Sequence, residues 1–256
     1  DEYNRYLENL LSGNNYVIAI DDFARVDLPF DIRVIPYYGA ERAGYKASLK
    51  TKLLLGPAYF IFQPEFTKAA CIERKIKKES QNILITMGGS DPFDLTVKVV
   101  SAITRVPFLN IHLRVVIGPG FKNVVKQAIE KNLRNFLGEY EIVEGNGSMV
   151  ELMHWSDLAL IAGGLTKYEA AVTGTPCISI SPFKRELKMA EMFEMGGSLL
   201  HLGIKDQVSL GKISEAVKKV LGDFTLRETM SKKGKRLVDG KGIEKIIAEI
   251  PKHLLL

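Results

Sequence analysis

From about residue 81 onward, short β-branched runs alternate with segments of helical periodicity, and this alternation constrains the fold more than any other feature. Such alternation is typical of a mostly parallel sheet covered by helices. The runs predict strands at 83–87, 111–117, 140–143, 158–162, 177–180 and 199–202. The patterns between them predict helices at 95–104, 122–132, 149–154, 167–172, 186–195 and 210–221. We therefore expect a doubly wound α/β domain in this part of the chain.

Residues 1–66 show fewer elements: a helix at 2–11, strands at 16–20 and 32–35, and an irregular run ending in LLLGPAYFIFQPEF. Two strands and a helix are too few to close a second α/β domain. The chain also begins with Asp1 rather than Met. We therefore expect this part to be an incomplete N-terminal domain whose first portion is missing.

The remaining segments complete the expected domain organisation. Residues 67–81 are densely charged with poor apolar periodicity, which indicates an exposed connector before a nucleotide-binding domain at 82–240. Further helices are predicted at 226–237 and 242–249, the latter ended by Pro251. Residues 241–256 are thus expected to form a C-terminal helical segment.

Composition narrows the class of protein. Hydrophobic residues make up 46% of the chain and charged residues 25%, which is ordinary for a globular protein. No apolar run is long enough to span a bilayer and no basic-then-apolar leader is present, so we expect a cytoplasmic protein. Solvated helix faces are the first explanation of the net charge of +5, and binding of an anionic ligand or of an acidic membrane surface is the second. Because no aromatic stacking platform accompanies the charge, we do not expect a nucleic-acid partner.

Cysteine and histidine give no sign of a metal site. Cys71 and Cys177 are far apart, and Cys177 stands in an apolar run where a buried, reduced thiol is expected. The four histidines share no ligand spacing and have no Cys or carboxylate cluster beside them. We therefore expect no metal.

Two predicted strands end in a paired glycine followed by a helix. Gly88 and Gly89 follow the strand at 83–87, and Gly163 and Gly164 follow the strand at 158–162. Ligands of open parallel sheets bind outside the carboxyl ends of the strands, and the N–H groups of a following helix favour an anion. A tight turn that needs glycine for conformation alone is the competing interpretation. Neither turn matches the dinucleotide or P-loop fingerprint, so we expect no NAD or ATP cofactor.

Glu169, near Gly163 and Gly164, and Asp91, near Gly88 and Gly89, each have two interpretations. Thr166 and Glu169 match a capping box, but a glutamate beside a phosphate-binding turn could also accept the hydroxyls of a ribose. Asp91 followed by proline resembles a helix cap, but Ser90 and Asp91 could also meet a sugar or phosphate.

Asp21 and Asp22 directly follow a strand, where paired acids often face a ligand, so they are candidate catalytic residues.

Four segments together carry a resemblance to a known family. IDDFAR (20–25), LLLGPAYFIFQPEF (53–66), MGGSDPFDLT (87–96) and LIAGGLTKYEAAVTGTPCISI (160–180) resemble the PseG family. These are UDP-sugar hydrolases of pseudaminic acid biosynthesis, and the related SpsG-like polysaccharide proteins share the pattern. The last segment also resembles GT-B glycosyltransferases of the MurG type. The resemblance implies a GT-B fold, with two Rossmann-like domains and the nucleotide held mainly by the C-terminal one.

The resemblance also implies roles for individual residues. The diphosphate would meet the backbone of Gly163, Gly164, Leu165 and Thr166, and Glu169 would hold the ribose. The backbone of Ile142 and Val143 would meet the uracil. Near the diphosphate and the sugar would lie Gly88, Gly89, Ser90 and Asp91.

This sequence departs from the family pattern at several places. The family turn G-x-G-H-x-x-R, whose histidine activates water, has no counterpart, so the catalytic histidine is expected outside this chain. Asparagines expected near Ile35 and Tyr37 are replaced, Gln63 stands where arginine is expected, and PFKRELKMA (182–190) replaces a glutamine-rich turn.

We expect a UDP-sugar hydrolase that releases UDP and an amino-deoxy sugar for nonulosonic acid or surface polysaccharide biosynthesis. The alternatives are a glycosyltransferase that docks peripherally at a membrane through its cationic surface, or a non-catalytic nucleotide-sugar-binding subunit.

Overall fold

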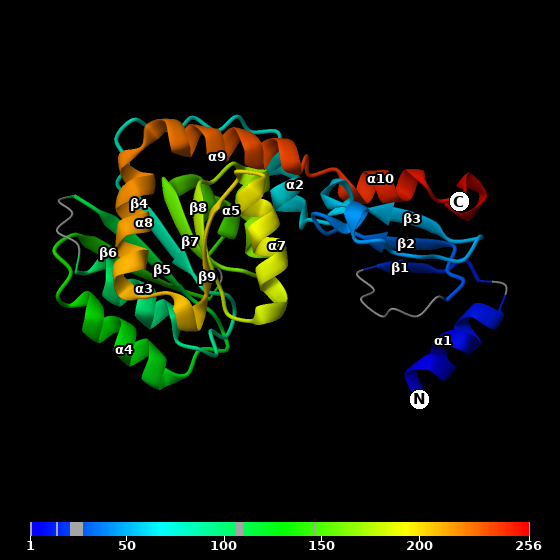
Figure 1. Ribbon diagram of the computed structural model, residues 1–256, viewed down its shortest axis with the longest axis horizontal. Helices are drawn as coiled ribbons and strands as arrows, with labels where there is room; N and C mark the ends of the chain where they lie inside the picture. Colours follow the sequence, from blue (N-terminus) through cyan, green and yellow to red (C-terminus); the bar gives the residue numbers. More distant parts are fainter. Residues whose placement is uncertain (1, 14, 21–27, 106–109, 146, 256) are drawn as a thin grey trace. The chain divides into compact units, whose positions relative to one another are not determined.

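The chain divides into two compact units, which are described separately (Figure 1). Unit 1 comprises residues 1–62 and 240–256, and unit 2 comprises residues 63–239. The computed structural model describes residues 2–13, 15–20, 28–105, 110–145 and 147–255. Asp21 and Asp22, the predicted catalytic candidates, lie outside the described residues.

Unit 2 is built on a parallel sheet of six strands in the order β6-β5-β4-β7-β8-β9. The strands are β4 (Asn82–Thr86), β5 (His112–Ile117), β6 (Glu139–Glu144), β7 (Leu158–Ala162), β8 (Cys177–Ser181) and β9 (Leu200–Ile204). Side chains of the central strands β7 and β8 are almost all buried, as expected where helices cover both faces of a parallel sheet.

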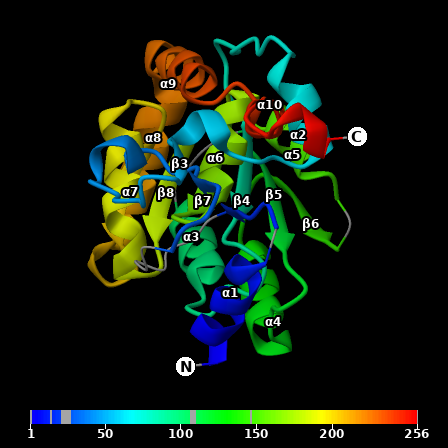
Figure 2. The ribbon, with the colours of Figure 1, turned by 90° about the vertical axis from the view of Figure 1, so that its right-hand side faces the viewer.

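Helices cover this sheet and close its core. They are α2 (Pro64–Ala70), α3 (Leu95–Ile103), α4 (Asn123–Leu133), α5 (Met149–Trp155), α6 (Thr166–Thr173), α7 (Lys184–Met195), α8 (Leu210–Gly222) and α9 (Phe224–Leu237), with the short 3₁₀ helix η3 (Lys205–Gln207). Helix α3 packs against α4 and α8, while α6 packs against α2, α5 and α9. In both views α9 lies at the top of unit 2 and α4 at the bottom (Figures 1 and 2).

The predicted elements of unit 2 agree with the structure, and their ends differ by no more than two residues. Helix α2 was not predicted. Residues 67–81, expected to be an exposed connector, group with unit 2, and most of residues 71–81 are exposed, but Arg74 among them is partly buried. Arg74 donates hydrogen bonds to the Met153 carbonyl (2.9 Å) and to Thr175 Oγ1 (2.9 Å). Burial lowers the pKa of the Arg74 guanidinium to about 10.

Unit 1 contains a parallel sheet of three strands in the order β1-β2-β3. Its elements are α1 (Glu2–Ser12), β1 (Ile18–Ile20), β2 (Ile32–Ile35), η1 (Ala40–Arg42), β3 (Lys52–Leu55), η2 (Pro57–Tyr59), α10 (Gly242–Ala248) and η4 (Lys252–Leu254). The small core joins Ile32, Val34 and Leu54 of the sheet to Ile246 of α10. Lys52 of β3 also forms an ion pair with Glu249, just after α10.

Strand β3 was missed by the sequence analysis, which expected an irregular segment there. Its four residues pair in register with β2, from Ile32 opposite Lys52 to Ile35 opposite Leu55. A four-residue run that ends at Gly56 carries little periodicity, so pairing with β2 rather than local pattern defines this strand.

No helix in the described part of the chain is long and apolar enough to cross a membrane.

Candidate functional site

The strand order of unit 2 reverses between β4 and β7. From β4 the chain moves outward to β5 and β6, and then returns to place β7 on the other side of β4. Such a reversal opens a crevice at the carboxyl ends of the two strands, which is where open α/β sheets bind their ligands. The glycine pair Gly88–Gly89 follows β4 and the pair Gly163–Gly164 follows β7. Both predicted glycine turns therefore flank the reversal point.

A buried lysine binds the backbone of the turn after β7. Lys167, in the first turn of α6, is 2% exposed. Its Nζ donates hydrogen bonds to the carbonyl oxygens of Gly163 and Gly164, both at 2.6 Å. Burial lowers the pKa of Lys167 to about 8, although Glu186 and Cys177 act in the opposite direction. At neutral pH an ammonium group therefore lies directly behind the glycine turn.

The outer side of this turn is open. Leu165 is 53% exposed, and a Cβ built on Gly164 meets no atom within 4 Å. Among the described residues, the N–H groups of Gly164 and Leu165 have no hydrogen-bond acceptor. These N–H groups stand just before the first turn of α6, whose dipole favours negative charge. The arrangement fits a phosphate group.

Behind Gly163 lie two polar groups that the sequence analysis did not select. A Cβ on Gly163 would lie 2.6 Å from Ser181 Oγ and 3.3 Å from Glu186 Oε2, so this position requires glycine. Neither oxygen has a hydrogen-bond partner among the described residues. Ser181 stands in the apolar run of β8 and Glu186 in a charged helix start, so local pattern gave no signal for either.

Glu169 lies on α6 one turn beyond the glycines and is half-buried. Burial raises the pKa of its carboxyl group, the charge of Glu65 raises it further, and a hydrogen bond with Thr166 opposes both. The capping box is not formed as predicted, because Thr166 is already the first residue of α6 and Leu165 occupies the cap position without a side-chain bond. Glu169 is thus a partly desolvated carboxylate near the open turn.

The turn after β4 has a different internal support. Asp91 is 3% exposed, and its carboxylate accepts hydrogen bonds from the N–H groups of Leu95 (2.9 Å) and Thr96 (2.7 Å). Asp91 is not the N-cap residue that was predicted, and Pro92 is not the first helical residue, because α3 begins at Leu95 and Asp94 occupies the cap position. Asp91 binds the first N–H groups of the helix from three residues farther back. A protein carboxylate already occupies the start of this helix. The exposed residues of this turn are Gly88, Gly89 and Ser90.

The residues expected to meet the uracil lie farther along the sheet. Ile142 and Val143 are half-buried on β6, an edge strand separated from β4 by β5. Strands lie about 5 Å apart, which puts β6 about 10 Å from β4 and about 15 Å from β7.

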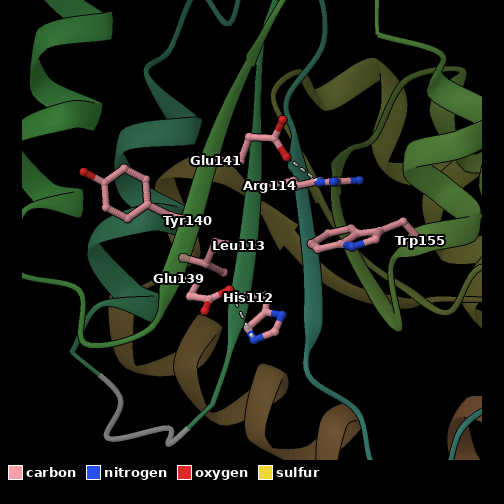
Figure 3. Close-up of a pocket in the computed structure, with 7 residues that line it drawn as sticks. All are labelled: His112, Leu113, Arg114, Glu139, Tyr140, Glu141 and Trp155. Atoms are coloured by element: carbon pink, nitrogen blue, oxygen red, sulfur yellow. Dashed lines mark hydrogen bonds and ion pairs between the residues drawn. The ribbon is translucent and has the colours of Figure 1, made fainter.

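A pocket of about 190 Å³ lies elsewhere, at the amino ends of β5 and β6 (Figure 3). His112 and Glu139 are the first residues of these strands. The Arg114 guanidinium lies 4.3 Å from the centre of the Trp155 ring, and its Nε donates to Glu141 at 2.7 Å. Because the glycine turns stand at the carboxyl ends, this pocket is not part of the candidate site.

Comparison with curated proteins gives relatives at 33% identity. The chain is 33% identical over 214 residues to the spore coat polysaccharide biosynthesis protein SpsG of Bacillus subtilis, a match that covers 82% of this chain and 61% of SpsG. The chain thus spans less than two thirds of the length of this relative. No protein-family model matches the chain.

Solved structures show the fold. Acinetobacter baumannii MurG superposes with a TM-score of 0.59 at 11% identity, covering 86% of this chain and 59% of MurG. WaaG, a glycosyltransferase involved in lipopolysaccharide biosynthesis, gives 0.55 at 16% identity, covering 98% of this chain and 82% of WaaG. UDP-GlcNAc 2-epimerase from Neisseria meningitidis bound to UDP-GlcNAc gives 0.51 at 18% identity, covering 68% of this chain and 44% of the epimerase. The chain has the GT-B fold of Rossmann-like units, as the sequence predicted.

Proposed function

We propose that the chain binds a UDP-sugar at the carboxyl edge of the unit 2 sheet, as part of an enzyme of polysaccharide biosynthesis. The observation that carries this proposal is the turn after β7, which presents two N–H groups to open space with a buried ammonium behind it. The role of SpsG in spore coat polysaccharide biosynthesis and the UDP-GlcNAc bound to a protein of similar fold support the substrate class.

In this proposal the diphosphate lies against Gly163, Gly164, Leu165 and Thr166. Glu169 accepts the ribose hydroxyls, a suitable task for a half-buried carboxylate near the turn. The backbone of Ile142 and Val143 at the sheet edge meets the uracil. The exposed turn of Gly88, Gly89 and Ser90 faces the sugar, with Asp91 supporting that turn from inside.

The proposed reaction is hydrolysis of the bond between the sugar and UDP. Water attacks the sugar and gives its proton to a general base, and UDP departs with the bonding electrons. Negative charge then grows on the phosphate oxygen that leaves, which the turn N–H groups face, and the ammonium of Lys167 lies behind these groups. Preorganised donors of this kind stabilise the transition state more than the ground state.

A glycosyltransferase is the second candidate, favoured by the match to WaaG over most of both chains. The same nucleotide site would serve transfer to an acceptor other than water. Release of UDP and free sugar by the whole protein without any acceptor would support hydrolysis, whereas turnover that requires an acceptor would support transfer. Binding of UDP with no turnover by the whole protein under either condition would support a non-catalytic subunit.

The test of the nucleotide site is the affinity of the chain for UDP, measured by calorimetry. We expect Glu169→Gln to weaken UDP binding by about tenfold, the effect of losing charge-assisted hydrogen bonds to the ribose. The melting temperature should stay near that of the unsubstituted chain.

Glu65→Gln is the matched control, because Glu65 is an exposed carboxylate that influences Glu169 only through its charge. Its affinity for UDP should stay within about threefold. A loss of stability without a loss of affinity in Glu169→Gln would return Glu169 to a purely structural role.

A further inference from the structure

We propose that Lys167 is a positioning residue for the diphosphate, which holds the carbonyl groups of Gly163 and Gly164 and thereby directs the N–H groups of Gly164 and Leu165 toward the ligand. This inference rests on the proposed nucleotide site and adds to it a residue that does not itself touch the nucleotide.

The direction of the two N–H groups follows from the geometry of the peptide bond. In a trans peptide the C=O and the following N–H point in opposite directions. The Gly163 carbonyl points to Lys167 Nζ, so the N–H of Gly164 points away from it. The Gly164 carbonyl does the same, so the N–H of Leu165 also points away. One ammonium group thus sets the orientation of two successive peptide planes.

Glycine makes this control necessary. A turn of two glycines has many accessible backbone conformations, and ordering it costs conformational entropy. If the turn were not already ordered, this cost would reduce the affinity for the ligand. A lysine ammonium has three donors and can hold both carbonyls at once. Lys167 therefore preorganises the turn before the diphosphate arrives.

The surroundings of the ammonium favour this role. The rings of Tyr168 and Phe193 lie 5.6 and 5.7 Å from Nζ, within reach of cation–π attraction. The titratable groups that influence it come from three other elements: Glu186 of α7, Cys177 of β8 and His201 of β9. Burial raises the pKa of Cys177 to about 12, so this thiol is uncharged at neutral pH. The carboxylate of Glu186 is then the group whose negative charge favours the ammonium form of Lys167.

A pH dependence of binding follows from this environment. The pKa of Lys167 in the empty chain is lowered to about 8. A diphosphate at the turn favours the ammonium form and therefore raises this pKa. Binding above about pH 8 must then take up a proton, so the affinity for UDP falls as the pH rises through the pKa of the empty chain. The terminal phosphate of UDP is ionised well below this range, with a pKa of about 6, and does not contribute.

Calorimetric titration of the 256-residue chain with UDP tests the inference. We expect Lys167→Met to weaken binding by about tenfold or more, as for the loss of charge-assisted hydrogen bonds. The decline in affinity between about pH 7 and about pH 8.5 should also disappear, which a merely structural effect would not produce.

Lys235→Met is the matched control. Lys235 also donates to two backbone carbonyls, those of Ala70 (2.9 Å) and Ile72, and burial also lowers its pKa. It lies beside Gly174 at the far end of α6, away from the glycine turn. We expect Lys235→Met to keep both the affinity for UDP and its pH dependence.

The outcomes separate this inference from the proposed function. If the unsubstituted chain binds UDP and Lys167→Met binds it equally well with the same pH profile, the role of Lys167 is overturned and the nucleotide site stands. If the unsubstituted chain binds no UDP, both fail. Should Lys167→Met not fold, titration of the unsubstituted chain in two buffers of different ionisation enthalpy decides. Absence of proton uptake at about pH 8 then overturns the inference.

Discussion

The two glycine turns of unit 2 share a pattern of strand, glycine pair and helix, but their buried charges are opposite. After β4, the carboxylate of Asp91 accepts the N–H groups of Leu95 and Thr96 at the start of α3. After β7, the ammonium of Lys167 binds the carbonyls of Gly163 and Gly164. The first turn has its helix N–H groups occupied by the protein itself, whereas the second leaves N–H groups directed outward.

This difference shows what a glycine pair does and does not determine. The glycines allow a sharp turn and close approach of another group. The buried charge beside them determines which backbone groups remain for a ligand. A carboxylate at the first turn repels an anion, and an ammonium at the second attracts one. The difference therefore favours the second turn for the proposed diphosphate site.

The largest expected effect comes from removing the charge that supports the first turn. Asp91→Asn retains the shape of the side chain but loses charge-assisted bonds to two buried N–H groups. We expect the free energy of unfolding to fall by about 2–3 kcal/mol, measured by urea denaturation.

The control is Asp94→Asn, since Asp94 is exposed and its side chain makes no cap hydrogen bond. Its stability should change by less than about 0.5 kcal/mol. Equal, small effects of the two substitutions would contradict a supporting role for Asp91.

A somewhat smaller loss of stability is expected within the second turn. Gly163→Ala would bring a methyl group to 2.6 Å from Ser181 Oγ and 3.1 Å from Ser181 Cα. Relief of this overlap requires rotation of the Ser181 side chain and a small shift of β8, and we expect a cost of about 1–2 kcal/mol in the free energy of unfolding. Thermal or urea denaturation measures it. A variant as stable as the unsubstituted chain would show that the turn is looser than described.

The next prediction compares affinity at the two turns. A Cβ at Gly164 or at Gly89 meets nothing within 4 Å, and neither residue has a left-handed φ, so alanine should be tolerated at both positions. We expect Gly164→Ala to weaken UDP binding by about tenfold, because the methyl group occupies space in front of the N–H groups. Gly89→Ala should change it by less than about threefold. The reverse order of effects would move the diphosphate to the first turn.

The smallest effect is expected at the opposite end of the sheet. Arg114→Ala removes the side chain that stacks on Trp155 in the pocket of Figure 3. Because that pocket lies at the amino ends of the strands, UDP affinity should not change measurably. A marked loss would indicate that the nucleotide binds there instead.

The fold of unit 2 could be predicted closely because its signals are local. Apolar runs fixed the positions of the strands, and the glycine pairs marked where β4 and β7 end. β3 could not be predicted in the same way. Its residues become a strand by pairing with β2, about twenty residues earlier in the chain, and no local pattern contains that information.

Within the candidate site, Gly163, Gly164 and Glu169 could be selected from the sequence, but their supports could not. Lys167 lies in the helical segment TKYEAAV, where a lysine is ordinarily expected to be exposed. In the structure its side chain is only 2% exposed. Ser181 and Glu186 reach the back of the turn from β8 and α7, and only the packing of these elements brings them there. The hydrogen bonds of Asp91 reach only four and five residues along the chain, which is why its proximity to the start of α3 could be predicted.

By itself, the sequence determined the strand and helix pattern of unit 2 and the two turns at the carboxyl ends of β4 and β7. These follow from hydrophobic periodicity and from glycine, which act over a few neighbouring residues. The GT-B class of fold was instead implied by the resemblance to a known family. Only the tertiary structure decided that the second turn has a buried cation behind it and outward N–H groups. Burial depends on what distant segments pack against a side chain, and burial decides whether a charged residue faces solvent or orients a backbone.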